Sequence, residues 1–155
     1  MKPDDVVVGI EKMRKQMPAN RLRSHLEKCA LQFGCPAAKN FFLSRYEAPL
    51  PTAQQCNARC LGCLSLQKDS DIPHSQDRIG FTPAPEEIAE VALAHIKRVD
   101  RSVVSFGQGC EGDPLMAARV IGPVPVVRKG LTCAIPTVEP LTISSDPDKA
   151  TTVFI

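Results

Sequence analysis

The sequence predicts an α/β fold, in which short buried strands alternate with helices. Two runs rich in apolar, aromatic or β-branched residues, at 40–46 and 102–106, flank a segment with helical periodicity at 85–98. Strands that alternate with helices form parallel sheets with right-handed crossovers. Ligand sites in such sheets lie beyond the carboxyl ends of the strands. The segments that follow these two runs are therefore where a site is expected.

Composition supports a single domain and excludes several classes of protein. The 155 residues are 43% hydrophobic and 23% charged, which suits one buried core, and a net charge of +2 is too small to indicate binding to nucleic acid or an anionic membrane. No run approaches the roughly 20 apolar residues of a membrane span, and the start lacks a signal peptide. The chain is therefore expected in the cytoplasm. Thiols stay reduced there, so seven cysteines suggest metal or redox chemistry.

Two helices are predicted to precede the first strand, in a helical segment over residues 1–39. Apolar residues at helical spacing predict a helix over 4–17, which Pro18 ends. Asn20 can cap a second helix, and Gly34 is a usual stop signal.

The predicted strand–helix–strand region spans residues 40–121. Asn40 to Tyr46 is predicted as a strand because it is aromatic and apolar and is followed by prolines. Pro85 suits the first turn of a helix that continues to about Arg98, and the β-branched run from Ser102 to Phe106 predicts the next strand.

Residues 122–155 are predicted to form a proline-rich, irregular tail. Five prolines interrupt each stretch that could otherwise be a helix or a central strand: Pro123, Pro125, Pro136, Pro140 and Pro147. The strand–helix pattern is not expected to continue there, which suggests a truncated or out-of-frame product.

Three cysteines stand close together after the first predicted strand, at Cys56, Cys60 and Cys63. Thiolates favour iron–sulfur clusters, zinc or copper(I), and Gly62 allows the loop to curl around a metal. A structural zinc site would need a fourth ligand. That ligand would have to come from the remaining cysteines, which are Cys29, Cys35, Cys110 and Cys133. A 4Fe-4S cluster with one iron left open is favoured over zinc and over unligated or disulfide-bonded cysteines.

This C-x-x-x-C-x-x-C loop after a strand resembles the hallmark of the radical S-adenosylmethionine (SAM) superfamily. The resemblance implies that the chain forms the first two units of a partial (β/α)6 barrel. It also implies that the open iron binds SAM, and that an electron from a donor such as flavodoxin or ferredoxin cleaves SAM to a 5'-deoxyadenosyl radical. The substrate of that radical is not indicated, and no catalytic side chain is assigned.

A glycine-rich turn follows the second predicted strand, from Gly107 to Leu115. Its segment Glu111-Gly112-Asp113-Pro114 resembles the G-G-E-P segment of the same superfamily, which binds the amino group of SAM. The cofactor-binding residues implied are Gly109, Glu111, Gly112, Asp113 and Pro114. The turn also fits the dinucleotide pattern G-x-G-x-x-G, but residues 120–138 contain no acid to bind a ribose. A plain tight turn is the third interpretation.

The remaining cysteines and histidines are weaker candidates. Cys29 and Cys35 could support a second metal site but are more typical of buried structural thiols. The three histidines, His25, His74 and His95, are expected to be packed or solvated. Two functional classes therefore stay open. One is a radical-generating enzyme, and the other is a small, non-catalytic iron–sulfur or zinc protein.

Overall fold

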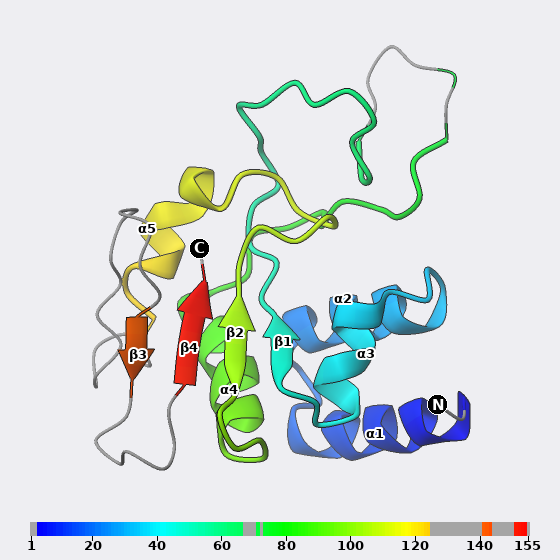
Figure 1. Cartoon of the computed structure of the whole chain (residues 1–155), viewed down its shortest axis with the longest axis vertical. Coiled ribbons are helices and arrows are strands. Elements are labelled where there is room, and N and C mark those ends of the chain that lie inside the picture. The colour runs from blue at the N-terminus through cyan, green and yellow to red at the C-terminus, as the bar shows by residue number, and fades with distance from the viewer. Residues whose placement is uncertain (1–2, 67–70, 72, 125–140, 144–150, 155) are drawn as a thin grey trace.

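The structure is a computed structural model that describes residues 3–66, 71, 73–124, 141–143 and 151–154. Its fold is α/β, as predicted, with helices packed around a small sheet (Figure 1). The elements in chain order are α1 (Pro3–Gln16), α2 (Arg21–Leu31), α3 (Pro36–Phe42), β1 (Glu47–Pro49), α4 (Pro85–Ile96), β2 (Val103–Ser105), the 3-10 helix η1 (Pro114–Ala117), α5 (Ala118–Ile121), β3 (Leu141–Ile143) and β4 (Thr151–Phe154).

The sheet has the strand order β1-β2-β4-β3. β1 and β2 run parallel, with Ala48 opposite Val104, and α4 forms the connection between them, which confirms the predicted strand–helix–strand unit. β4 is also parallel to β2, whereas β3 is antiparallel to β4. In Figure 1, α1 to α3 lie beside β1, α4 lies behind the sheet, and α5 lies above β3, on the side of the sheet away from α1 to α3.

The N-terminal segment contains three helices, whereas two were predicted. α1 and α2 occupy the predicted positions, and the Asn20 side chain caps α2 by accepting the Arg23 backbone N–H at 2.8 Å. The strand predicted over 40–46 is wrong, because α3 extends to Phe42, a turn follows it, and the strand begins at Glu47. Pro36 fits the first turn of α3. Phe41 and Phe42 are buried on this helix, although aromatic residues are also typical of strands.

The tail also differs from the prediction at two places. Leu141–Ile143 and Thr151–Phe154 form β3 and β4, so the segment after residue 122 is not irregular throughout. Pro140 stands directly before β3 and not inside it. The strand itself therefore contains no proline. Apart from these two strands, the structure describes the tail only from residue 122 to Val124.

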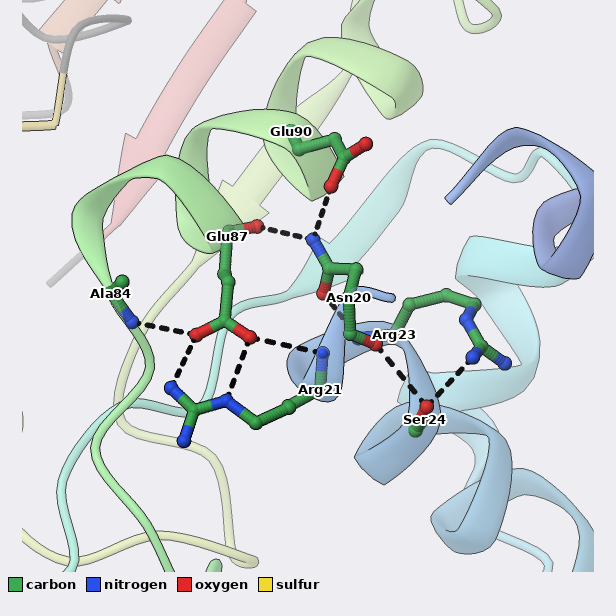
Figure 2. Close-up of polar contacts among 7 residues, drawn as sticks. All are labelled: Asn20, Arg21, Arg23, Ser24, Ala84, Glu87 and Glu90. Carbon is green, nitrogen blue, oxygen red and sulfur yellow. Dashed lines mark hydrogen bonds and ion pairs between the residues drawn. The ribbon is translucent and has the colours of Figure 1, made fainter. Parts of the chain in front are cut away.

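A network of hydrogen bonds joins the start of α2 to the start of α4 (Figure 2). The Glu87 carboxylate accepts the Ala84 N–H at 2.8 Å and, from Arg21, the backbone N–H at 3.0 Å and the guanidinium at 2.7 and 2.9 Å. The Asn20 amide donates to the Glu87 carbonyl at 3.0 Å and to the Glu90 carboxylate at 2.7 Å. These bonds satisfy otherwise unpaired donors at two helix N-termini.

The hydrophobic core lies between the N-terminal helices, α4 and the first two strands. Its fully buried side chains include Ile10, Met13, Leu22, Leu26, Phe41, Leu50, Ile88 and Val91. The face of α4 that points into the core contains Ile88, Val91, Ala92 and His95, which are buried, while Ile96 is only partly buried. Among the described residues, no helix is long and apolar enough to cross a membrane.

Candidate metal centre

The cysteine loop and the glycine-rich turn lie at the same end of the sheet. The first leaves the carboxyl end of β1 and the second leaves that of β2, at the top of Figure 1. The Leu50 N–H donates to the Ser105 carbonyl at 2.7 Å, so the two chains still run together where the strands end. The parallel sheet therefore brings the two motifs together, as the sequence predicted.

Backbone hydrogen bonds join the glycine-rich turn to the residues just before Cys56. The Gly112 N–H donates to the Ala53 carbonyl at 2.6 Å, and the Asp113 N–H donates to the Gln55 carbonyl at 3.0 Å. A Cβ atom on Gly112 would lie 1.9 Å from the Gln55 carbonyl oxygen. Only glycine allows so close an approach of two backbones.

The buried Glu111 carboxylate accepts hydrogen bonds both from the glycine-rich turn and from the chain just before Cys56. One oxygen accepts the Thr52 N–H at 2.7 Å, the Thr52 hydroxyl at 3.2 Å and the Ala53 N–H at 3.0 Å. The other oxygen accepts the Gly107 N–H at 2.6 Å and the Gln108 N–H at 3.0 Å. Glu111 is 4% exposed. The family resemblance implied that Glu111 contacts the cofactor. In the structure its side chain instead accepts hydrogen bonds from the protein itself.

The other residues of the turn are more open. Asp113 is partly buried and accepts the Leu115 N–H at 2.9 Å, which caps η1, and Pro114 is the first residue of η1. A carboxylate offers about four acceptor positions, so Asp113 retains capacity for another donor. A Cβ atom on Gly109 would lie 2.8 Å from a Leu64 methyl carbon. The turn therefore also packs against the cysteine loop just after Cys63.

The three cysteines of the triplet occupy an accessible loop. Cys56 and Cys60 are exposed and Cys63 is partly buried, while Gly62 has φ +74°, a conformation that favours glycine. The backbone N–H of Ser65 lowers the pKa of the Cys63 thiol below its usual value, and the Leu66 amide and the charge of Arg78 act in the same direction. The Arg78 guanidinium donates to the Cys63 sulfur at 3.5 Å.

The triplet is not gathered around a single point. Within the described residues, the three sulfurs do not all lie within 4.8 Å of one another, which a site for one ion would require. A cubic cluster contacts each thiolate at a separate iron corner and so spaces its ligands more widely.

A second set of side chains that could hold a metal ion was not predicted as a group. One ligand atom each from His25, Cys29 and Cys110 lies within 4.8 Å of the others, and the His25 Nε2 is 3.5 Å from the Cys29 sulfur. Cys29 and Cys110 are buried and His25 is partly buried. The spacing of His25 and Cys29 on one helix face was visible in the sequence, but the approach of Cys110 depends on tertiary packing.

The two buried thiols of this group share a proton. A hydrogen bond from Cys110 lowers the pKa of Cys29 to about 5, and His25 acts in the same direction. The same contact and burial raise the pKa of Cys110 well above its usual value. The contact therefore favours ionisation of Cys29 over ionisation of Cys110.

The other sequence candidates have separate environments. His95 is buried and its Nε2 lies 3.1 Å from the Tyr46 carbonyl oxygen, which confirms the expected packing role. His74 is exposed, as expected, and lies 3.6 Å from Asp77. Cys35 is partly buried beside the end of α2, and Cys133 lies outside the described residues.

Comparison of the chain with protein-family models, with curated proteins and with solved structures gives no match in any of the three.

Proposed function

We propose that the chain binds a 4Fe-4S cluster through Cys56, Cys60 and Cys63 and binds SAM at the adjoining glycine-rich turn. The observation that carries this proposal is the backbone pairing of Ala53 and Gln55 with Gly112 and Asp113. This pairing makes the cysteine loop and the turn one structural unit, so that a ligand on the turn would lie beside the loop.

The triplet has the properties that a cluster requires. Its thiols are soft ligands on a loop that solvent reaches, and Cys63 has a lowered pKa, which favours the thiolate that binds iron. Three thiolates leave one iron of a 4Fe-4S cluster without a protein ligand. When bound and reduced by a donor such as flavodoxin or ferredoxin, the cluster would supply the electron that splits SAM into methionine and a 5'-deoxyadenosyl radical.

The turn has the acceptors that the ammonium group of SAM requires. The Asp113 carboxylate is partly exposed and is the acidic side chain of the turn with remaining acceptor capacity. Glu111 holds the turn in place through five internal donors and therefore positions the acceptors without contacting SAM itself. No catalytic side chain is proposed.

The unit β1-α4-β2 fits the beginning of a partial (β/α)6 barrel. Its two strands are parallel and α4 connects them, as in each unit of such a barrel. β3 does not fit this pattern, because it is antiparallel to its neighbour. The barrel assignment therefore rests on the first two strands.

Anaerobic reconstitution with ferrous iron and sulfide tests the cluster. The full chain should bind about four irons and show the absorption and, once reduced, the electron paramagnetic resonance of a 4Fe-4S cluster. Cys60→Ser should remove this cluster, whereas Leu61→Ser, at the next and fully exposed position, should keep it. Equal iron content in these two variants would overturn the proposal.

Addition of SAM tests the second half of the proposal. SAM should change the resonance of the reduced cluster, and dithionite should then release 5'-deoxyadenosine. An Asp113→Asn variant should bind SAM more weakly while keeping its cluster. A wild-type protein that holds its cluster but neither responds to SAM nor forms 5'-deoxyadenosine would instead be a non-catalytic iron–sulfur protein.

A further inference from the structure

The group formed by His25, Cys29 and Cys110 contains none of the residues proposed to hold the cluster. It links two distant parts of the chain, because His25 and Cys29 belong to α2 and Cys110 belongs to the glycine-rich turn. Cys29 and Cys110 are 0% and 3% exposed. Buried thiols of this kind are either inert packing groups or ligands of a closed metal site.

The spacing of the three ligand atoms fits one metal ion. Bond lengths of about 2.3 Å to sulfur and about 2.0 Å to nitrogen, in tetrahedral geometry, place zinc ligands roughly 3.5 to 3.8 Å apart. The His25 Nε2 lies 3.5 Å from the Cys29 sulfur, and one ring nitrogen of His25 and the two sulfurs all lie within 4.8 Å of one another. These distances are compatible with three ligands of one ion.

We propose that His25, Cys29 and Cys110 bind a zinc ion that ties α2 to the glycine-rich turn. Two thiolates and one imidazole form a donor set that zinc prefers.

A tetrahedral zinc ion needs a fourth ligand. Cys35 is a candidate, because its backbone N–H donates to the Cys29 carbonyl at 3.0 Å. The fourth ligand is either this thiol or a water molecule. A thiol in the fourth position would make this a closed, structural zinc site, whereas a water would leave one coordination position open.

The site can be tested apart from the cysteine triplet. The background is the full chain with Cys56→Ser, Cys60→Ser and Cys63→Ser, which removes the competing thiols from an accessible loop. This protein should bind one Zn²⁺ by equilibrium dialysis. Co²⁺ in its place should give tetrahedral d–d bands and thiolate-to-cobalt charge-transfer bands. Absence of stoichiometric Zn²⁺ binding would overturn the proposal.

Substitution of single ligands identifies the site. In the same background, Cys29→Ser or His25→Gln should weaken Zn²⁺ binding by more than about 100-fold, because even changes around a metal ligand cost 10- to 100-fold. The matched control is His74→Gln, at an exposed histidine outside the group, which should leave the affinity unchanged. Equal affinity in His25→Gln and His74→Gln would contradict the proposal.

X-ray absorption of the zinc-loaded background protein requires no substitution at the proposed site. Its result therefore does not depend on whether the single-ligand variants fold. The expected spectrum shows two or three sulfur ligands at about 2.3 Å and at least one imidazole nitrogen at about 2.0 Å. Two sulfurs indicate a water as the fourth ligand, and three indicate Cys35. A zinc ion surrounded by oxygen and nitrogen alone would overturn the proposal.

Discussion

The buried carboxylate of Glu111 accepts the backbone N–H of Thr52 at 2.7 Å, and this bond connects the chain that leaves β2 to the chain that leaves β1. The same carboxylate accepts two N–H groups of its own turn, from Gly107 and Gln108. One side chain therefore fixes both the shape of the glycine-rich turn and its position against the cysteine loop.

Glu111→Gln should destabilise the protein strongly. An amide has one acceptor oxygen, so its NH₂ group would face backbone donors that the second carboxylate oxygen now satisfies. Loss of charge-assisted bonds that leaves buried donors unpaired costs about 3 kcal/mol or more of the free energy of unfolding, which urea denaturation measures. Glu11→Gln, at an exposed position on α1, is the matched control and should change stability by less than about 0.5 kcal/mol. Similar losses in both variants would show that the Glu111 bonds contribute little.

Gly112→Ala should disrupt the junction between the turn and the cysteine loop. The added Cβ would lie 1.9 Å from the Gln55 carbonyl oxygen, and a backbone atom cannot move aside as a flexible side chain can. We expect a loss of about 2 kcal/mol or more in the free energy of unfolding, together with weaker cluster loading. Gly80→Ala is the control, because no atom lies within 4 Å of its Cβ position, and it should be neutral or slightly stabilising. Equal stability of the two variants would contradict the close approach at Gly112.

The place of the candidate site was predictable from the sequence because it depends on topology. Cys56 and Gly107 each follow a strand, and parallel pairing puts the ends of both strands at one edge of the sheet. The role of Glu111 was not predictable. A carboxylate in a glycine-rich turn suits a ligand as well as it suits internal donors, and only the path of the chain shows that Thr52 and Ala53 lie within reach.

The parts of the fold that were predicted wrongly are those where the amino-acid composition suits both a helix and a strand. Phe41 and Phe42 suit a buried strand, but they also suit the buried face of a short helix, and the proline at the start of α3 was the signal that favoured the helix. The proximity of Cys29 and Cys110 was hidden for another reason. It follows from the packing of α2 against the turn, which no local pattern encodes.

The Glu87 carboxylate should make stability depend on acid pH. Hydrogen bonds from Arg21 lower its pKa to about 2 from an ordinary value of 4.5, so its contribution is fully present above about pH 4.5 and is lost as the pH falls towards 2. Glu87→Gln should cost about 1 kcal/mol at pH 7, a modest value because Arg21 is 55% exposed. The variant and the wild type should become equally stable near pH 2.

Glu86→Gln is the matched control for this prediction. Glu86 belongs to the same first turn of α4 but is exposed, so it shares the helix dipole without the Arg21 bonds. Thermal unfolding at a series of pH values measures both variants. A stability difference between Glu87→Gln and wild type that stays constant from pH 7 to pH 3 would show that the ionised carboxylate is not the source of the effect.

His95 is a buried histidine that folding keeps neutral. Burial lowers its pKa below 6.5, and the nearby charge of Arg98 acts in the same direction. Because the Tyr46 carbonyl can only accept, the Nε2 carries the proton. The Nδ1 is left as the only buried side-chain polar atom without a hydrogen-bond partner among the described residues.

His95→Leu should therefore remove a part of the acid sensitivity of the protein. Below about pH 6.5 the unfolded chain takes up a proton at His95 that the folded chain does not, so the free energy of unfolding falls as the pH falls, by at most about 1.4 kcal/mol per pH unit. Urea denaturation between pH 7 and pH 5 should show a smaller slope for His95→Leu than for wild type. His74→Leu, at an exposed histidine, should keep the wild-type slope. A His95→Leu slope equal to that of wild type would mean that the folded protein accepts a proton at His95 as readily as the unfolded chain does.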